Sequence, residues 1–243
     1  MTAAQPTIIA TSISFNRTAG SVWDGAAGPA YRLAISLARA GKHPRMCVLA
    51  TGLGDNPIYL AAFHSAFSEL DMLVSHLALF PVPSVADIRE HLLSQDIIWV
   101  AGGSTANLLA VWRLHQLDTI LHECWQAGIV LMGTSAGSVC WHAAGTTDSW
   151  RMPLRPLLNG LGFVPYSNSP HYSSERERRP VTRQLIAEGV LPDGFATDDG
   201  AGLVYFGADL HEAICDTPGA KAYSIVRKAG DQAVETELPT RLL

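Results

Sequence analysis

The sequence predicts an α/β fold in which helices cover both faces of a doubly wound, mostly parallel sheet. Short apolar runs alternate with amphipathic stretches along most of the 243 residues, as parallel strands joined by helical crossovers require. Hydrophobic residues make up 48% of the chain and charged residues 16%, which is enough apolar material for a sizeable buried core. The length fits a single domain spanning residues 1–243.

Compact apolar runs, mostly flanked by Gly, Pro, Asp or Ser, predict buried parallel strands. The expected strands are Thr7–Thr11, Met46–Ala50, Met72–Leu79, Ile97–Ala101, Ile129–Met132 and, later in the chain, Leu203–Phe206.

Helical spacing of apolar residues predicts the connections between these strands. The expected helices are Pro29–Ala40, Ile58–Leu70, Val85–Leu93 and Thr105–Ala127, the last broken into two near His115. Ser84 directly precedes the third helix and acidic Asp87 lies within it, which favours Ser84 as the N-cap. The stretch Leu154–Ser174 predicts a long irregular segment, and such loops are often functional.

Charge and composition argue against several classes of protein. The formal net charge of −5 gives no basic footprint for nucleic acid. No apolar run approaches the roughly 20 residues that span a bilayer, and the N-terminal segment lacks the features of a signal peptide. The four cysteines form no CxxC pair, so reduced core cysteines are expected rather than disulfides or a zinc site. The sequence therefore predicts a cytoplasmic protein without nucleic-acid or membrane partners.

The segment Gly133-Thr-Ser-Ala-Gly137 predicts a nucleophilic serine. It follows the expected strand Ile129–Met132 and precedes an expected helix, which is the setting of a G-x-S-x-G nucleophile turn. The flanking glycines allow a sharp turn, and the helix start directs N–H groups at developing negative charge. A glycine-rich turn with an incidental serine is the alternative. We take Ser135 as the candidate nucleophile.

A serine nucleophile needs a general base within hydrogen-bond reach. Most of the nine histidines lie in or at the ends of expected helices, where a surface or packing role is favoured. His142 is expected in the helix after the nucleophile and directed away from it. His171 lies in the irregular segment, which can reach the carboxyl edge of the sheet. We take His171 as the candidate base.

Three aspartates are candidates for the acid that orients the base. Asp199 and then Asp198 are favoured, since both directly precede the Leu203–Phe206 strand, and Asp148 is the third candidate. Any of them could instead cap its own backbone in a turn. If Asp199 is the acid, the chain order is Ser, His, acid, which departs from the Ser, acid, His order of α/β-hydrolases. If Asp148 is the acid, the chain order alone does not exclude an α/β-hydrolase.

A second glycine site follows the strand Ile97–Ala101. Gly102 and Gly103 open a helix there, and exposed N–H groups at a helix start suit an oxyanion. The amides of Gly103 and Ala136 would then form an oxyanion hole. The alternative is a turn in which Ser104 caps the helix and the glycines serve only the backbone.

Three arginines follow the candidate base. Arg176, Arg178 and Arg179 are placed to bind a substrate carboxylate, since guanidinium groups pair with carboxylates bidentately. The neighbouring Glu175 and Glu177 allow a plainer interpretation, a self-paired helix start.

These segments together resemble the peptidase E family of serine peptidases, to which cyanophycinase is related. The resemblance is strongest for the peptidase E-like proteins of actinobacteria. The matching segments are, in chain order, Val100–Leu109, Gly133–Cys140, Thr146–Asp148, Pro170–Tyr172 and Thr197–Leu203.

The resemblance implies a class I glutamine amidotransferase-like fold and a cytoplasmic aminodipeptidase that prefers an N-terminal aspartate. It makes Ser135 the nucleophile and His171 the base, with Gly103 and Ala136 as the oxyanion hole. The third member of the family triad is a glutamate, and it falls on the Asp198–Asp199 pair, best on Asp199. Asp148 matches a further aspartate implicated in the family. The segment after His171 is shorter than in peptidase E, so the basic residues there have no fixed counterpart.

The sequence therefore predicts a serine peptidase that hydrolyses short peptides through an acyl-enzyme, as a monomer or homodimer, without metal or cofactor. Two alternatives stay open: a serine amidase or other hydrolase of a non-peptide substrate, and a non-catalytic small-molecule binder of the same fold. A cysteine-nucleophile amidotransferase is disfavoured, because Ser135 occupies the turn and Cys140 lies further along the chain.

Overall fold

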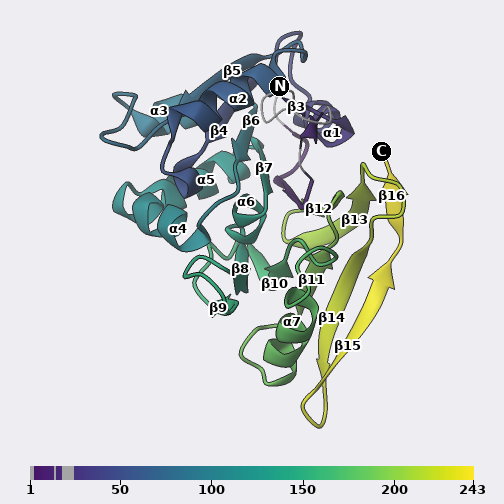
Figure 1. Ribbon diagram of the computed structural model, residues 1–243. Coiled ribbons are helices and arrows are strands. Elements are labelled where there is room, and N and C mark those ends of the chain that lie inside the picture. Colours follow the sequence, from purple (N-terminus) through teal and green to yellow (C-terminus); the bar gives the residue numbers. More distant parts are fainter. Residues whose placement is uncertain (1–2, 14, 18–24) are drawn as a thin grey trace.

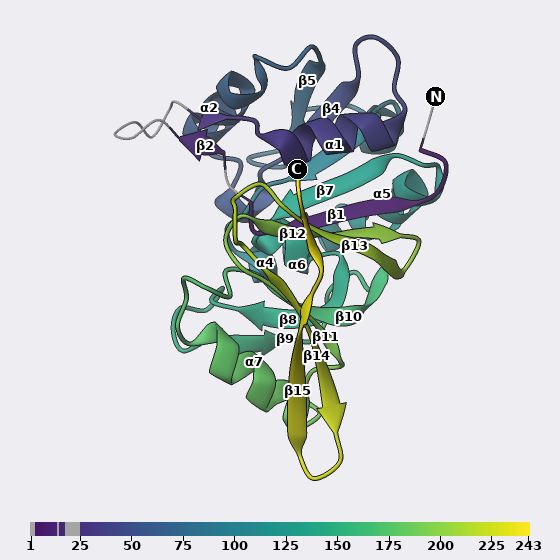
Figure 2. The ribbon, with the colours of Figure 1, turned by 90° about the vertical axis from the view of Figure 1, so that its right-hand side faces the viewer.

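The computed structural model describes residues 3–13, 15–17 and 25–243 and contains a large and a smaller mixed sheet (Figures 1 and 2). The helices are α1 (Pro29–Ala38), α2 (Pro57–Phe67), α3 (Ile88–Leu93), α4 (Thr105–Leu114), α5 (Leu117–Gln126), α6 (Ala136–Val139) and α7 (Arg178–Ala187), with a 3₁₀ turn at Thr51–Leu53. The strands are β1 (Thr7–Thr11), β2 (Asn16–Arg17), β3 (Gly25–Ala26), β4 (Arg45–Leu49), β5 (Leu73–Leu77), β6 (Ile97–Val100), β7 (Val130–Thr134), β8 (His142–Thr147), β9 (Arg155–Leu157), β10 (Val164–Ser169), β11 (Gly194–Thr197), β12 (Ala201–Phe206), β13 (Asp209–Cys215), β14 (Ala222–Lys228), β15 (Gln232–Leu238) and β16 (Thr240–Leu242).

The large sheet has eight strands in the order β16-β13-β12-β1-β7-β6-β4-β5. The strands β1, β7, β6, β4 and β5 are all parallel to one another. On the other side of β1, β12 is antiparallel to β1, β13 is antiparallel to β12, and the edge strand β16 is parallel to β13. Parallel order places the carboxyl ends of β1, β6 and β7 at one edge, which is where ligand sites of such sheets form. The predicted doubly wound, mostly parallel sheet is therefore confirmed.

Both faces of this sheet are covered by helices, so its central strands are apolar on both sides. On one face Ile9, Val48 and Trp99 pack against α1 and α2. On the other, alternate residues such as Ile8 and Leu131 pack against α3, α4 and α5. The continuous apolar runs that predicted these strands reflect this two-sided burial.

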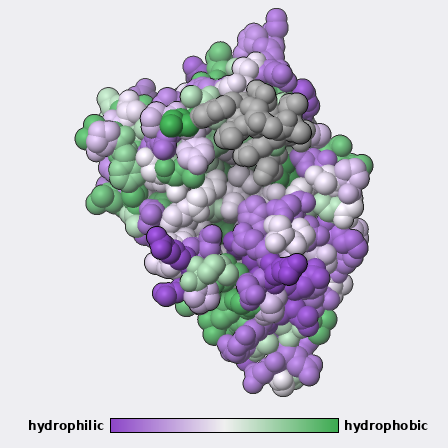
Figure 3. All heavy atoms as spheres, viewed as in Figure 1, coloured by the Kyte–Doolittle hydropathy of each residue, from purple (hydrophilic) through white to green (hydrophobic). Residues whose placement is uncertain are grey.

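The smaller sheet has six strands in the order β15-β14-β11-β10-β8-β9. One side joins the core beneath the large sheet, since Phe163 and Val164 belong to the same apolar cluster as Ile8. The other side packs against α7 through Ile186 and Ile225. The hairpin β14–β15 projects beyond the body (Figure 2), and hydrophilic residues make up much of the surface around it and α7 (Figure 3).

Several predicted element boundaries are wrong. The stretch Leu154–Ser174 is not one irregular loop, because it contains β9 and β10. Ser84 does not cap α3; the Asp87 side chain accepts the Glu90 amide at 2.9 Å and the helix begins at Ile88. The Ser84 hydroxyl instead accepts the Ala78 amide. Asp87 is the N-cap because it directly precedes Ile88, the first helical residue, and its carboxylate can therefore reach the free amides of the first turn.

Other local predictions are confirmed. The predicted break near His115 is present, with Gln116 at φ 59° between α4 and α5. All four cysteines are buried and unpaired.

Within residues 3–13, 15–17 and 25–243, no helix is both long and apolar enough to cross a membrane. That the whole chain forms one domain stays a prediction.

Candidate active site

Ser135 lies in a sharp turn between β7 and α6, at the carboxyl edge of the large sheet. Its backbone adopts φ 56° and ψ −117°, a conformation that costs an L-residue of order 1–3 kcal/mol. The Ser135 amide donates to the Thr11 carbonyl at 3.0 Å, which ties the turn to the end of β1. The strand–turn–helix setting predicted from the sequence is present.

The two glycines of the turn are required by close backbone approach. A Cβ on Gly133 would overlap the Gly137 carbonyl, and one on Gly137 would overlap the Val100 carbonyl. The turn therefore folds back on itself and against the end of β6. Both glycines serve the geometry of the turn.

The Gly102–Gly103 loop lies against Ser135. A Cβ on Gly102 would lie 3.3 Å from the Ser135 Cβ, and Gly103, at φ 111°, approaches Gly52 too closely for any side chain. Ser104 is the N-cap of α4, with its hydroxyl accepting the Asn107 amide at 3.2 Å. In the described part of the chain the Gly103 amide has no hydrogen-bond acceptor, and its role in an oxyanion hole stays a prediction.

His171 lies just after β10 and faces the same edge. It too has a positive φ, 57°, and its amide donates to the Ser12 hydroxyl at 3.0 Å. Its side chain is 20% exposed, and Nδ1 donates to the Asp199 carboxylate at 2.6 Å. Among the described residues, the Ser135 hydroxyl makes no hydrogen bond to the imidazole; such contacts often close only when substrate binds.

The adjacent carboxylates Asp198 and Asp199 have opposite environments. Burial opposes ionisation of Asp199, yet hydrogen bonds from His171, Ser174 and Ser173 outweigh it and hold the pKa of Asp199 below its usual value. Burial raises the pKa of Asp198, although the Lys221 amide and the Tyr223 hydroxyl both approach its Oδ2 at 3.3 Å. The structure thus brings Asp199 to His171 and directs Asp198 elsewhere.

A cavity of about 270 Å³ joins the predicted residues. It is lined by Gly103, Ser104, Ser135, Asp148, Ser149, His171, Glu175 and Arg178. Asp148 therefore lies at the cavity, with its side chain exposed and no hydrogen bond to His171 among the described residues.

The three arginines diverge. Only Arg178 lines the cavity; it is buried, with Nε bound to Glu175 at 2.7 Å and Nη1 to the Thr146 carbonyl at 2.9 Å. Arg179 stacks between the rings of Tyr172 and Tyr223. Arg176 is exposed.

The expectation for His142 is wrong in detail. Helix α6 ends at Val139, so His142 begins β8 instead of extending the helix. Its ring is fully buried, donating from Nδ1 to the Ser138 carbonyl and accepting at Nε2 from the Tyr205 hydroxyl. Burial lowers the pKa of His142 to about 4, so the ring is neutral.

Sequence reasoning missed two serines that support the site. The Ser12 hydroxyl holds the backbone of His171, and the Ser149 hydroxyl accepts the Ala106 amide beside the glycine loop. Ser12 follows a buried strand directly, and a polar residue at the carboxyl end of a parallel strand is a usable signal for a site. Ser149 lies in a turn with no comparable pattern.

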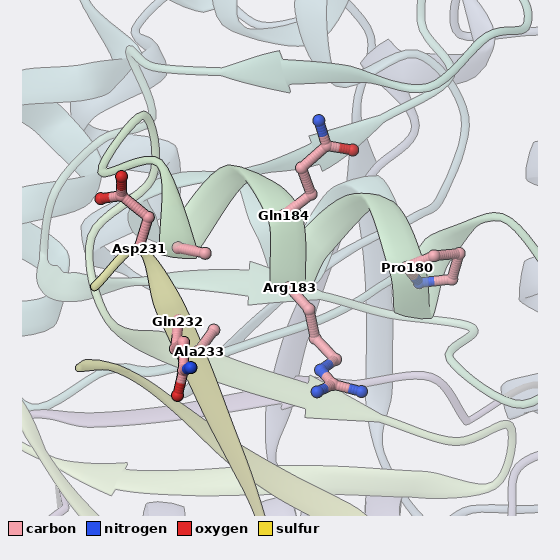
Figure 4. A pocket seen from close by; sticks show the side chains of 7 residues that line it. Pro180, Arg183, Gln184, Asp231, Gln232 and Ala233 are labelled. Carbon is pink, nitrogen blue, oxygen red and sulfur yellow. The ribbon is translucent and has the colours of Figure 1, made fainter. Parts of the chain in front are cut away.

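A second hollow, of about 370 Å³, lies between α7 and the β14–β15 hairpin (Figure 4). It is lined by Pro180, Arg183, Gln184, Ala187, Asp231, Gln232 and Ala233 and contains none of the predicted site residues. Across the described ranges, no group of three or more His, Cys, Asp and Glu side chains is arranged to hold a metal ion.

Comparison with known proteins gives consistent matches. The model of peptidase family S51 matches residues 35–213. An uncharacterized peptidase of Bacillus subtilis, YgaJ, is 42% identical over 202 residues, covering 83% of this chain and 86% of that protein. Peptidase E of Shewanella baltica is 32% identical over 117 residues, about half of each chain.

The fold has a counterpart among solved structures. The crystal structure of a peptidase from an acI-B1 actinobacterium covers 96% of this chain and 97% of its own, with a TM-score of 0.63 at 14% identity. At that identity the likeness concerns the fold alone.

Proposed function

The chain belongs to peptidase family S51 and is a serine peptidase, and we propose that it hydrolyses short peptides with Ser135 as nucleophile, His171 as general base and Asp199 as the orienting acid. The observation that carries this assignment is the shared cavity: Ser135 and His171 both line it, and the His171 ring is held from behind by Asp199.

The proposed mechanism follows from the tautomer of His171. Because Nδ1 carries a proton and donates a hydrogen bond to Asp199, Nε2 has the lone pair that accepts the Ser135 proton. The Ser135 oxygen then attacks the scissile carbonyl carbon. Protonated His171 gives its proton to the leaving amine, and water, activated by the same nitrogen, hydrolyses the acyl-enzyme. Asp199 stays ionised throughout and stabilises the imidazolium.

We assign the oxyanion hole to the amides of Gly103 and Ala136. Ala136 is the first residue of α6, so its N–H has no acceptor within the helix, and the Gly103 amide is also without one in the described chain. A donor aimed at the developing oxyanion contributes roughly 3–4 kcal/mol to the transition state.

We propose that the cavity admits a short peptide and that Arg178 contributes to recognition of an acidic N-terminal residue. Nε and Nη1 of Arg178 are occupied by Glu175 and Thr146, which leaves Nη2 for a substrate carboxylate. Asp148 and Glu175 add negative charge at the same cavity, where a peptide ammonium group would be stabilised. In this proposal the preference for an N-terminal aspartate depends on the Arg178 guanidinium alone, whose charge Glu175 partly neutralises.

The first experiment compares wild type with Ser135→Ala, using a fluorophosphonate probe and a set of dipeptides. We expect labelling of the wild type alone and a loss of hydrolysis of about 10³-fold or more in the variant. Folded wild-type protein that neither labels nor cleaves would favour a non-catalytic binder. Labelling with cleavage only of simple esters or amides would favour an amidase or another hydrolase.

Specificity is tested by comparing Asp-Leu with Asn-Leu, which differ by a charge at similar size. We expect wild type to favour Asp-Leu and Arg178→Lys to lose most of that preference, since an ammonium does not reproduce the guanidinium geometry. Arg183→Lys, on the same helix but at the second hollow, is the matched control and should keep the wild-type ratio. Equal ratios in all three proteins would contradict the role of Arg178.

A further inference from the structure

We propose that Asn168 is a positioning residue for the hydrolytic reaction, and that it acts through Ser138 to fix the nucleophile turn to the strand that precedes His171. The inference rests on the proposed function, because it concerns how Ser135 and His171 are held relative to each other. Neither Asn168 nor Ser138 lines the cavity.

The first link holds the Ser135 backbone. The Ser138 hydroxyl donates to the Ser135 carbonyl at 2.8 Å, alongside the amides of Ser138 and Val139 at 2.8 and 3.0 Å. Ser135 has the unusual φ of 56°, which persists only when surrounding contacts determine it. The hydroxyl bond is therefore one of the contacts that hold the strained turn.

The second link runs from Ser138 to Asn168. The Asn168 amide nitrogen, Nδ2, donates to the Ser138 hydroxyl at 3.0 Å, and both residues are almost completely buried. A hydroxyl has one proton, and Ser138 gives it to the Ser135 carbonyl, so the hydroxyl must accept from Asn168. The direction of the chain is thus fixed: the Asn168 amide, then the Ser138 hydroxyl, then the Ser135 carbonyl.

The Asn168 side chain has one polar contact in the described structure. Its Oδ1 is buried and has no hydrogen-bond partner, which is unfavourable for an amide. A buried amide with an unpaired acceptor is poorly explained as a source of stability. The donor bond to Ser138 is the contact that accounts for an asparagine at this position.

The bond crosses between the two segments that carry the reacting side chains. Asn168 lies on β10, three residues before His171, whereas Ser138 lies in α6, three residues after Ser135. Gly145 on β8 lets these segments meet, because a Cβ there would overlap the Asn168 carbonyl and lie 2.8 Å from Val139 Cγ1. The link between Ser138 and Asn168 therefore sets where the serine turn lies relative to the histidine.

The test measures the rate of fluorophosphonate labelling, kcat and KM for Asn168→Ala and Ser138→Ala, singly and together. We expect each single variant to label and turn over about tenfold more slowly, with little change in KM, because one hydrogen bond between uncharged groups is worth roughly that factor. The double variant should be no slower than Ser138→Ala, since Asn168 acts through Ser138.

Ser167→Ala is the matched control. Ser167 is the preceding residue on β10, is buried, and donates to the Pro192 carbonyl at 2.8 Å, so its replacement also removes a buried hydrogen bond, away from the turn. We expect Ser167→Ala to label at the wild-type rate even though it lowers the melting temperature by removing a buried hydrogen bond. Should Asn168→Ala fail to fold, Ser138→Ala, which deletes one oxygen, carries the comparison.

Three outcomes would contradict the inference. Folded Asn168→Ala or Ser138→Ala that labels at the wild-type rate would show that the link does not position the serine. Equal slowing in Ser167→Ala would reduce the effect to general stability. In both cases the proposed function survives, because the wild type still labels and cleaves; a wild type that does neither overturns both proposals.

Discussion

At the scale of single residues, the two neighbouring carboxylates Asp198 and Asp199 differ through their surroundings. Asp199 is 43% exposed and receives a histidine and two serine hydrogen bonds, which keep its carboxyl ionised. Asp198 is buried beside Tyr223, and burial favours its protonated form. Environments that separate the pKa values of adjacent acids commonly assign them different roles. This difference supports Asp199, rather than Asp198, as the proposed partner of a histidine cation.

This difference predicts the effect of Asp199→Asn. An asparagine cannot hold the tautomer in which Nδ1 carries the proton as a carboxylate does, so we expect kcat to fall by about 10³- to 10⁴-fold with the fold retained. Steady-state hydrolysis of a dipeptide and circular dichroism measure the two quantities. Asp198→Asn is the control, because it makes the same change at the adjacent residue, and it should change kcat little. A large loss of kcat in Asp198→Asn together with a small one in Asp199→Asn would make Asp198 the orienting acid.

Ser135 and His171 share a further property that the sequence does not display. Both have a positive φ, although neither is glycine. Such strain is concentrated at functional sites, where other contacts over-determine the backbone. Here the contacts come from Thr11 and Ser12, the adjacent residues at the end of β1. Two adjacent residues therefore contact the backbones of both candidate catalytic residues, Thr11 through its carbonyl and Ser12 through its hydroxyl.

At the scale of elements, apolar strands could be predicted and polar ones could not. The range predicted for the first strand, Thr7–Thr11, coincides with β1, because both faces of that strand are buried and its composition is uniformly apolar or threonine. β10 reads Val-Pro-Tyr-Ser-Asn-Ser, with a proline and four polar or amphipathic residues, and gives no such signal. Its serines and asparagine are buried through hydrogen bonds to distant segments, which local periodicity does not reveal.

The candidate site divides in the same way. Ser135 and Gly103 could be found because local backbone geometry demands glycine at fixed spacing around them. The choice of Asp199 over Asp198 could not be made from spacing, because the two residues are adjacent in the turn between β11 and β12 and differ in the segments that their side chains contact. The roles of Ser138 and Asn168 depend on contact between α6 and β10, which are 30 residues apart at that bond.

The buried histidine at the start of β8, just after α6, leads to a prediction about how stability depends on pH. His142, at the start of β8, is neutral in the folded protein because burial lowers its pKa from the usual 6.5 to about 4. The unfolded chain binds a proton at this residue before the folded chain does, so its contribution to stability is complete above about pH 6.5 and declines as the pH falls toward 4. A shift of this size corresponds to about 3 kcal/mol.

Urea unfolding at several pH values measures this effect. We expect His142→Asn to be less stable than wild type at neutral pH and to lose less stability than wild type on acidification from pH 6.5 to 4. His211→Asn, at an exposed position, is the control and should follow the wild-type profile. Parallel profiles for all three proteins would mean that His142 is not the residue that links stability to pH.

At the scale of the whole molecule, the site lies where the chain passes between the two sheets. Ser135 follows β7 of the large sheet and precedes β8 of the smaller one, and Asp199 lies between β11 of the smaller sheet and β12 of the large one. His171 comes from the smaller sheet alone. The geometry of the site therefore depends on how rigidly the two sheets are joined.

Buried contacts across the junction predict that the two sheets unfold together. Phe163, next to the smaller sheet, stacks on Trp141 and Trp125, and His142 of β8 binds Tyr205 of β12. Separating the sheets would expose this apolar cluster to water and break the hydrogen bond between His142 and Tyr205. Both changes raise the free energy of a state in which only one sheet is folded. We therefore expect one cooperative transition.

Tryptophan fluorescence and far-ultraviolet circular dichroism, followed through the same urea titration, test this expectation. The fluorescence comes from Trp99 and Trp112 in the core of the large sheet and also from Trp125 and Trp141 at the junction with the smaller sheet, whereas circular dichroism reports on both sheets. Coincident curves, with equal calorimetric and van't Hoff enthalpies, are expected for a single domain. Two separate transitions, with circular dichroism and fluorescence curves that do not coincide, would make the smaller sheet a domain of its own. Labelling of Ser135 should then be lost at the step that unfolds the smaller sheet, because His171 and the Asn168 link belong to that sheet.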